Sequence, residues 1–330
     1  MSEQMALQIS DLKSHFFTSK GVVPAVDGVS IDVPQGKIIG IVGESGCGKS
    51  MTAMSVMGLL RHPGKVVGGS ITLDGRDITH LNTRDMSKVR GADLSIIFQE
   101  PMTSLNPVYT VGKQVSEAIL LHQKVSREEA KKRVIDIFRE VGIPEPEKRY
   151  HSYPHQLSGG LRQRVMIGMA MVCKPKVMIA DEPTTALDVT IEAQILRLMR
   201  KLRDEQGTSI IMITHNMGVV AELCDYVYVM YAGKVMEQAE TYELFERTEH
   251  PYTNGLLRSI PKLDDNVDRL YTIDGVVPNL LKLPQGCSFC NRCEEAVVRC
   301  FKERPDLYET HDGHKVRCFK YDKGGMSDGR

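Results

Sequence analysis

A glycine-rich segment near the start of the chain has the residue types and spacing that bind phosphate. It runs from Gly43 to Ser50 as Gly-Glu-Ser-Gly-Cys-Gly-Lys-Ser, directly after the apolar run Ile38–Val42 and before a helical stretch. Glycines allow the backbone to curl so that successive N–H groups face phosphate oxygens, and the N-terminus of the following helix adds a favourable dipole. This strand–loop–helix arrangement of G-x-x-x-x-G-K-S predicts a P-loop that binds a nucleoside triphosphate.

Two residues at the end of this loop have individual expected roles. We expect Lys49 to reach the β- and γ-phosphates and Ser50 to ligate magnesium. A glycine-rich turn without a ligand is the alternative interpretation, and the strand–loop–helix setting speaks against it. The predicted nucleotide-contacting residues of this segment are Gly43, Glu44, Ser45, Gly46, Cys47, Gly48, Lys49, Ser50 and Met51.

A pair of adjacent carboxylates ends a second apolar run. Asp181 and Glu182 directly follow Val177–Ala180. We expect Asp181 to hold magnesium, usually through water, and Glu182 to polarise the attacking water as a general base. Two acids at the end of a strand are more often simply solvated, but a P-loop upstream in the same chain reverses that preference.

The overall composition bears on compartment and partners. Lys+Arg and Asp+Glu both number 42, and this zero net charge gives no support for nucleic acid as the main partner. No apolar run approaches the about 18 residues of a membrane-spanning helix, and residues 1–10 lack the apolar core of a signal peptide. We therefore expect a chain that stays in the cytosol and does not itself cross a bilayer.

A group of cysteines near the C-terminus is the third feature with chemical potential. In a reducing cytosol disulfides are disfavoured, so this group needs another explanation. By spacing alone, Cys287-x2-Cys290-x2-Cys293 is similar to a ferredoxin-like loop, with Cys300 and Cys318 as further ligands. Zinc bound by four thiolates is the main alternative, and unligated thiols are the third. Either metal would hold together a region that is poor in apolar residues.

The apolar runs between these groups predict a parallel sheet flanked by helices. A capping box at Ser126 and Glu129 starts one helix, and Ala193–Leu202 has the apolar stripe of another. The fold class expected is α/β, with a mostly parallel sheet core that places ligands at the carboxyl ends of its strands. The four runs expected to be buried strands are Ile38–Val42, Ser95–Phe98, Val177–Ala180 and Ile210–Thr214.

Other patterns predict how the chain is divided. Leu7–Val33 reads as strands of a small antiparallel sheet, and Asp74-Gly75 as the turn of a hairpin. A second hairpin, Tyr226–Met230 with Lys234–Glu237, closes the first domain, and a short helix then opens at His250. We therefore expect an ATP-binding domain at 1–249, with a helical subdomain at about 100–172, and a cysteine-rich extension at 250–330.

The segment Leu157-Ser158-Gly159-Gly160-Leu161-Arg162-Gln163 completes an ordered set of motifs. With the P-loop before it and the acid pair after it, the chain resembles the ATP-binding-cassette family, whose signature is LSGGQ. Position 161 is Leu where the commonest form of the signature has Gln. The resemblance covers residues 7 to about 248 and implies a P-loop cassette ATPase that binds ATP and Mg²⁺.

The resemblance implies further site residues. Gln99 matches the Q-loop glutamine that senses magnesium and the lytic water, and His215 matches the switch histidine that contacts the γ-phosphate. Phe16 matches the aromatic residue that stacks on adenine, with Phe17 as the alternative. Asp188 matches the D-loop residue at the dimer interface. Ser158, Gly159 and Gly160 would contact the ATP that is bound to a second ATPase subunit, so that a dimer sandwiches each ATP.

Other segments resemble one branch of the family, the peptide/nickel importers. These segments are Gln99–Pro107, Tyr153–Gly160 and the stretch from His250-Pro-Tyr-Thr253 to Ser259-Ile-Pro261. The resemblance implies the D-type ATPase of an importer of di- and oligopeptides, peripheral on the cytoplasmic face of the cell membrane. Its implied partners are a second ATPase that is often a different chain, two permease subunits and an extracellular binding protein.

Two alternative functions remain open from the sequence. A nickel or other small-solute importer would use the same ATPase with a different cargo. A soluble cassette protein of DNA repair or translation usually has a long coiled-coil insertion or two cassettes, and neither is visible here.

The resemblance also suggests a ligand set for the cysteines. Long-form peptide-permease ATPases resemble this tail, with Cys-x5-Cys-x6-Cys and a later Cys, which implies a 4Fe-4S cluster on Cys287, Cys293, Cys300 and Cys318. Cys290 is then surplus and could exchange with a neighbour. Zinc remains the alternative metal.

Overall fold

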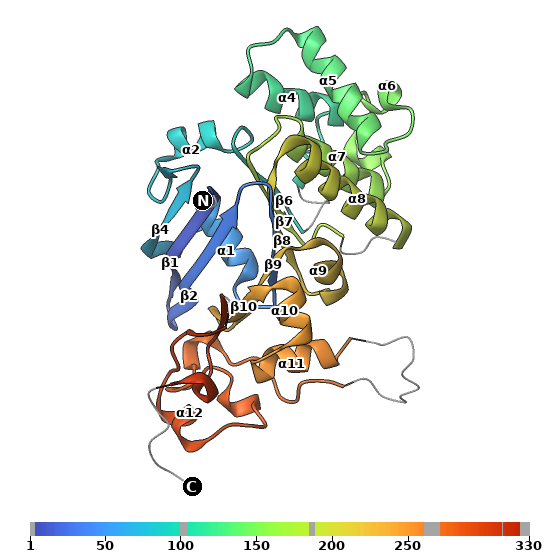
Figure 1. The fold of residues 1–330 in the computed structure, drawn as a ribbon. Coiled ribbons are helices and arrows are strands. Elements are labelled where there is room, and N and C mark those ends of the chain that lie inside the picture. The colour runs from blue at the N-terminus through green and yellow to red at the C-terminus, as the bar shows by residue number, and fades with distance from the viewer. Residues whose placement is uncertain (1–3, 100–103, 185–188, 261–270, 312, 324–330) are drawn as a thin grey trace. The chain divides into compact units, whose positions relative to one another are not determined.

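The structure of the chain is a computed structural model (Figure 1), and it describes residues 4–99, 104–184, 189–260, 271–311 and 313–323. The chain divides into two compact units, each assembled from several separate stretches. The division suggested by the sequence at residue 249 lies inside the second unit, which therefore holds both the P-loop segment and the C-terminal cysteines. The first unit comprises Met1–Leu7, Val33–Lys37 and Leu73–Ile211, and the second comprises Gln8–Asp32, Ile38–Thr72 and Met212–Arg330.

A sheet in the second unit leads into the P-loop and continues to a C-terminal hairpin. β3 (Ile38–Val42) is buried at every position, as its unbroken apolar sequence predicts, and pairs in parallel with β9 (Tyr226–Tyr231). β9 pairs antiparallel with β10 (Lys234–Glu240), which confirms the expected hairpin. β10 then pairs with β12, and β12 with β11. The bounds of the two short strands are Tyr308–His311 for β11 and His314–Val316 for β12.

The second unit also contains most of a small N-terminal sheet and several helices. β1 (Met5–Thr18) lies between β2 (Gly21–Pro34) and β4 (Gly64–Leu73), where the sequence predicts a small sheet. The helices are α1 (Lys49–Val56), α9 (Met217–Leu223), α10 (Thr241–Glu246), α11 (Pro251–Arg258) and α12 (Val298–Lys302). Short 3-10 turns span Leu280–Lys282, Cys290–Arg292 and Phe319–Tyr321.

The first unit combines parallel strands with a group of helices. β6 (Leu94–Ile97) pairs in parallel with β7 (Val177–Asp181), which confirms two of the predicted buried strands. β8 (Ser209–Thr214) begins in this unit and ends in the other. Helices α4, α5 and α7 pack against one another (Figure 1). Other elements of the unit are β5 (Arg76–Asp77), α2 (Thr83–Val89), α4 (Val111–His122), α5 (Arg127–Glu140), α6 (Pro146–Arg149), the 3-10 turn Pro154–Gln156, α7 (Gly159–Met171) and α8 (Val189–Gln206).

Two local features of the first unit follow turn and capping rules. Asp74 and Gly75 both have positive φ, 47° and 77°, as a two-residue Asp-Gly turn requires. The Oγ of Ser126 accepts the N–H of Glu129 at 3.1 Å and so caps α5 as predicted. The second half of the predicted capping box is not seen, because the Glu129 carboxylate pairs instead with Arg133 at 2.7 Å. Among the described residues, no helix is long and apolar enough to cross a membrane.

Candidate functional site

Two glycines allow the P-loop to run where a side chain would clash with neighbouring backbone. Gly43 has φ 147°, and a Cβ at this position would lie 2.2 Å from the carbonyl oxygen of Met230 in β9. Gly48 has φ 108°, and a Cβ there would lie 2.5 Å from the carbonyl oxygen of Ala25 in β2. Both conformations are ones that residues with a side chain rarely adopt. The loop therefore rests directly on the main chains of β9 and β2.

Lys49 directs its ammonium group into this loop from the first turn of α1. Its Nζ donates hydrogen bonds to the carbonyl oxygens of Gly43 at 2.7 Å and Glu44 at 3.1 Å, and the side chain is buried. A positive charge is thus held inside the loop, which suits an anionic ligand. Cys47 is fully buried beside it, and burial raises the pKa of its thiol. Cys47 is therefore a neutral packing residue and not a nucleophile.

Gln99 and Glu182 come together in the first unit. The Nε2 of Gln99 donates a hydrogen bond to Oε2 of Glu182 at 2.9 Å. Glu182 has φ 47°, a left-handed conformation that costs a residue with a side chain on the order of 1–3 kcal/mol and that concentrates at functional sites. Asp181, one position earlier, is the buried last residue of β7. The two adjacent acids therefore have different environments, as different chemical roles require.

The N-terminus of α7 carries the Ser-Gly-Gly segment. Ser158 caps the helix, because its Oγ accepts the N–H of Leu161 at 3.4 Å. A Cβ placed on Gly159 or Gly160 would meet no atom of the described residues within 4 Å. Farther along the helix, the Nε2 of Gln163 donates to the carbonyl oxygen of Pro183 at 2.6 Å, directly after Glu182. The helix start therefore presents a smooth and open backbone surface with the positive end of the helix dipole.

Four other residues are candidate site residues from the sequence. His215 is exposed and directly follows β8. Phe16 is half-buried, with its ring against the backbone of Gly64, where a Cβ would lie 2.7 Å from the ring. Phe17 is more exposed, at 48%. Asp188 lies outside the described residues. Phe16 and His215 belong to the unit that holds the P-loop, and Gln99, Glu182 and the Ser-Gly-Gly segment to the other.

The five C-terminal cysteines line a single cavity of about 240 Å³. The N–H of Cys287 donates to the carbonyl oxygen of Cys300 at 2.8 Å, which joins two of the cysteine-bearing segments. Gly286 makes this approach possible, since a Cβ there would lie 2.2 Å from the Cys300 oxygen. None of the five forms a disulfide, and burial raises the pKa of Cys287 to about 12 and that of Cys293 to about 11. Without a bound metal, the thiols of Cys287 and Cys293 are therefore neutral.

An ion pair that the sequence does not reveal joins the cysteine segment to the P-loop. Arg292 donates two hydrogen bonds to the carboxylate of Glu44, from Nη1 at 2.6 Å and from Nη2 at 3.0 Å. Its Nε and Nη2 also donate to the carbonyl oxygens of Asp274 at 2.9 Å and Ile273 at 3.1 Å. The hydrogen bonds to Glu44 outweigh burial and raise the pKa of Arg292. The guanidinium therefore stays charged although its side chain is only 5% exposed.

Three aromatic rings lie under the same loop. Tyr231 and Tyr252 contact each other with ring centroids 4.7 Å apart, and each has the ring of Phe289 at 5.3 Å. Phe289 sits in the cysteine segment, and Tyr252 accepts the backbone N–H of Glu44 on its Oη at 2.8 Å. Glu44 is thus held through both its main chain and its side chain. Glu44 occupies a variable position of the P-loop pattern, so the sequence gives no signal for these contacts.

Comparisons with protein families find two matches along the chain. Residues 26–185 match the family described as ABC transporter. Residues 236–300 match the family described as oligopeptide/dipeptide transporter, C-terminal region. The first match covers the P-loop, the Ser-Gly-Gly segment and the acid pair. The second covers four of the five clustered cysteines.

Curated relatives match over nearly their whole length. The oligopeptide transport ATP-binding protein AppD of Bacillus subtilis (strain 168) is 48% identical over 97% of this chain and 98% of its own length. The dipeptide transport ATP-binding protein DppD of Escherichia coli (strain K12) is 44% identical over 94% of this chain and 95% of its own. Both proteins are described as ATP-binding subunits of peptide transport.

Solved structures with the same fold include two ATP-binding cassettes. A dimeric structure of the cassette MJ0796, in a post-hydrolysis state with ADP and phosphate bound, is 25% identical with a TM-score of 0.65, over 71% of this chain and 98% of that one. The cassette CbiO1 of Clostridium perfringens, part of a transporter complex, is 30% identical with a TM-score of 0.62, over 75% of this chain and 93% of that one. The part of the chain that these structures leave uncovered is close in size to the expected C-terminal extension.

Proposed function

The chain belongs to the ABC transporter family as an ATP-binding subunit, and from this membership we propose that it powers the import of di- and oligopeptides. The observation that carries the proposal is the agreement of both halves of the chain: the cassette matches one family and the C-terminal region matches a family of oligopeptide and dipeptide transporters. Relatives named for peptide transport cover almost the entire chain. This agreement favours peptides over nickel as the cargo.

The residues of each unit supply a distinct part of ATP hydrolysis. Lys49 and the N–H groups of the P-loop would bind the phosphates. Ser50, Gln99 and Asp181 would supply oxygen ligands to Mg²⁺, and the ion would neutralise charge that develops on the phosphates. Glu182 acts as the general base. The hydrogen bond from Gln99 to Glu182 supports this assignment, because it orients the carboxylate. Phe16 would stack on adenine, and His215 would contact the γ-phosphate.

A substitution at the proposed base tests this chemistry. Glu182→Gln keeps the size of the side chain but removes its basicity, so we expect turnover to fall by about 10²- to 10⁴-fold while ATP still binds. Glu128→Gln, at an exposed acid on α5, is the control and should leave turnover unchanged. Turnover and nucleotide binding are measured on the same preparations. Near-normal hydrolysis by Glu182→Gln would show that the base lies elsewhere.

The partner subunits follow from the incomplete site. One chain supplies one P-loop and one Ser-Gly-Gly segment, and the open backbone at Gly159 and Gly160 supports the close approach of a second subunit's ATP. We infer that Asp188 lies at that interface. The complete importer would hold two such ATPases, two permease subunits and an extracellular binding protein, with this chain peripheral on the cytoplasmic face of the membrane.

The cysteine cavity is proposed to hold a 4Fe-4S cluster on Cys287, Cys293, Cys300 and Cys318. Five thiol groups around one cavity are donors that suit iron–sulfur clusters or zinc. A tetrahedral zinc site with Zn–S bonds of ~2.3 Å holds its sulfurs ~3.8 Å apart. Both metals therefore fit the donors, and the resemblance of this tail to long-form peptide-permease ATPases is what favours the cluster over zinc.

Metal analysis distinguishes the two metals. The full-length protein is purified without oxygen, and its iron, sulfide and zinc are measured together with its visible absorption. A brown protein with about four irons and matching sulfide per chain would agree with the cluster. One zinc per chain without iron would replace the cluster with a zinc site and leave the ATPase function intact.

Peptide uptake is tested in cells. A strain that lacks this chain and cannot make one amino acid is supplied with that amino acid only as di- or tripeptides. We expect no growth, with growth restored by the wild-type chain but not by Lys49→Ala, which weakens nucleotide binding. The free amino acid is the control and should support growth in every strain. Undiminished growth on peptides, combined with a loss of nickel uptake, would assign the chain to the alternative cargo.

A further inference from the structure

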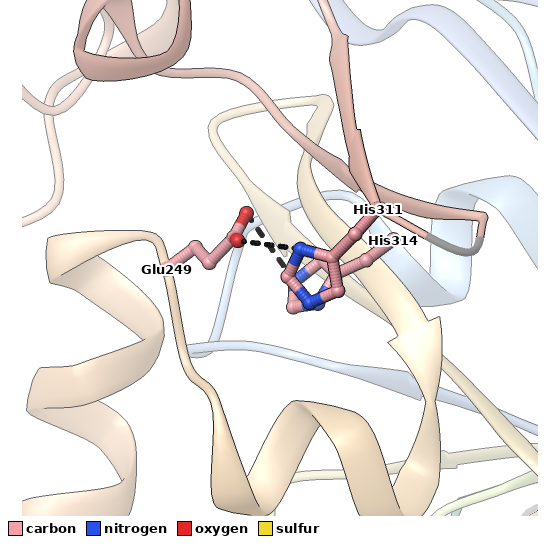
Figure 2. A group of neighbouring side chains, drawn as sticks. All are labelled: Glu249, His311 and His314. Atoms are coloured by element: carbon pink, nitrogen blue, oxygen red, sulfur yellow. Dashed lines mark ion pairs between the residues drawn. The ribbon is translucent and has the colours of Figure 1, made fainter.

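A second set of metal-binding side chains lies where the C-terminal hairpin meets the segment before α11. Glu249, His311 and His314 each offer one ligand atom, and these atoms all lie within 4.8 Å of one another (Figure 2). The Nδ1 of His311 is 3.4 Å from Oε1 of Glu249, and the Nε2 of His314 is 3.8 Å from Oε2 of Glu249. Figure 2 shows the two rings one behind the other, facing the same carboxylate.

Buried hydrogen bonds fix this group in place. The Nε2 of His314 is 2.8 Å from Oε1 of Glu237, and both side chains are almost fully buried. The same carboxylate accepts the backbone N–H of Glu249 at 2.7 Å and of His250 at 3.1 Å. Glu237 therefore positions one ring and the backbone of the facing acid together. Because this bond uses Nε2, the same nitrogen that faces Glu249, a cation bound there would replace the hydrogen bond to Glu237.

Several polar atoms of this group are buried without a hydrogen-bond partner in the described residues. They include Oε2 of Glu249, whose side chain is only 10% exposed and whose oxygen faces His314. Nε2 of His311 and Nδ1 of His314 are in the same state, as is Oε2 of Glu243, which lies 3.9 Å from His311. Burying polar atoms without partners is unfavourable, and most buried polar groups are satisfied. Of these atoms, Oε2 of Glu249 faces Nε2 of His314, and a cation bound between the two would give this oxygen the partner that it lacks.

A proton is the competing occupant. Burial lowers the pKa of His314, but the hydrogen bond and charge of Glu237 outweigh it and raise that pKa. Protonation and a cation on Nε2 both leave an N–H at Nδ1, for which the described residues offer no acceptor, so Nδ1 does not distinguish the two occupants. Protonation, however, leaves Oε2 of Glu249 without a hydrogen bond. A cation that binds Nε2 of His314 and Oε2 of Glu249 together would satisfy that oxygen as well.

We propose that Glu249, His311 and His314 bind one divalent transition cation of the Zn²⁺ type. Two imidazoles and a carboxylate are ligands of zinc, whose Zn–N and Zn–O bonds of ~2.0–2.2 Å place neighbouring ligand atoms roughly 3.4 Å apart. The separations of 3.4 and 3.8 Å already approach that value. Glu237 and Glu243 are further carboxylates beside the two rings. The cation would fasten the β11–β12 hairpin to the segment that leads into α11.

This site is chemically separate from the cysteine cavity. Its donors are nitrogen and oxygen, whereas the cavity offers sulfur, so spectroscopy with Co²⁺ as a zinc substitute distinguishes the two. Thiolate ligation gives an intense charge-transfer band in the near ultraviolet, and nitrogen and oxygen ligands give only weak visible bands. The inference does not depend on the peptide cargo or on ATP hydrolysis.

The test uses the full-length protein, purified without oxygen and treated with a chelator to remove loosely bound cations. The protein is titrated with Co²⁺ and then with Zn²⁺ as competitor. We expect one Co²⁺ per chain with weak visible bands and no new thiolate band. His311→Ala should weaken that binding at least tenfold, and its ring is 35% exposed, so the fold should tolerate the change. Glu249→Gln, which keeps the side-chain shape, should weaken binding similarly.

The matched control is Glu309→Gln, an exposed acid on the same hairpin strand. It should bind Co²⁺ as the wild type does. Saturating Zn²⁺ should also raise the melting temperature of the wild type and of Glu309→Gln, but not that of His311→Ala. The proposal is overturned if His311→Ala and the wild type bind Co²⁺ equally, or if every bound Co²⁺ has the thiolate band.

Discussion

The P-loop and the cysteine cavity lie in the same unit, yet they are built in opposite ways. The P-loop gets its shape from backbone conformations that only certain residues allow, such as Gly43 and Gly48 packed on neighbouring main chains. The cysteine cavity gets its character from side-chain donors that several metals accept. A motif that dictates backbone shape therefore identifies its ligand from sequence, whereas a set of donors identifies only a class of ligands.

The comparison is sharpest for the cysteines, where two nearby positions should behave differently. Cys293→Ser removes a proposed cluster ligand, so we expect loss of the metal and a lower melting temperature, because metal binding contributes to folding. Cys290→Ser is the matched control, since Cys290 lines the same cavity but is surplus to the proposed ligand set. Iron content and thermal unfolding are measured for both. Retention of iron by Cys293→Ser and its loss from Cys290→Ser would reassign the ligand.

A second prediction concerns the P-loop, whose shape depends on its backbone conformation. Gly43→Ala places a Cβ 2.2 Å from the Met230 oxygen at φ 147°, so the loop must distort. Such strain costs on the order of 1–3 kcal/mol, and we expect ATP affinity to fall by about tenfold or more. Gly46→Ala is the control, because it has φ 78° but meets no atom within 4 Å. Nucleotide titration should show a clearly smaller loss for Gly46→Ala, and equal losses would mean that packing does not shape the loop.

A third prediction concerns the connection between the two regions. Arg292→Met removes both hydrogen bonds to Glu44, and charge-assisted bonds of this kind contribute about 1.5–3 kcal/mol. We expect a less stable protein and an ATP affinity several-fold weaker, because Glu44 belongs to the P-loop. Arg299→Met is the control, since its ion pairs are more exposed and lie away from the loop. If Arg292→Met changes stability but not ATP affinity, the ion pair supports the fold alone.

The sequence predicted the parts that depend on local rules. The buried strands β3, β6 and β7 follow from apolar runs, and the Ser126 cap from a pattern of a few residues. The cassette family follows from ordered motifs whose spacing is fixed by backbone geometry. Each of these signals is contained in a short segment, so tertiary contacts are not needed to read it.

The parts that the sequence did not predict depend on residues far apart in the chain. Glu44 and Arg292 are separated by 248 positions, and no spacing rule connects a P-loop residue to an arginine among cysteines. Glu249, His311 and His314 likewise meet only because β12 pairs with β10. The Glu129 side chain shows the same limit on a smaller scale, since a nearby arginine competed for it. Which partner a side chain takes, and which distant residues meet, depends on the folded structure.

The prediction with the smallest expected effect concerns an ion pair beside the P-loop. Asp27 and Lys234 form this pair at 2.8 Å. The backbone N–H of Asp27 donates to the Gly233 carbonyl, and the Gly233 N–H donates to the Cys47 carbonyl of the loop. Burial raises the pKa of Asp27, but the hydrogen bond and charge of Lys234 outweigh it, so the pKa is lowered in the folded protein. A carboxyl group with a lowered folded-state pKa stabilises the protein above its unfolded pKa of about 3.9.

That stabilisation is lost as the pH falls through the folded-state pKa. Lys234→Met should therefore lower the free energy of unfolding by about 1 kcal/mol at pH 7, and by less at a pH below the folded-state pKa, where Asp27 is protonated in both proteins. Denaturant unfolding of wild type and variant at several pH values measures the difference. A difference that does not depend on pH would mean that Lys234 acts through packing and its bond to the Asp27 carbonyl. The charge of Asp27 would then contribute nothing to the free energy of unfolding.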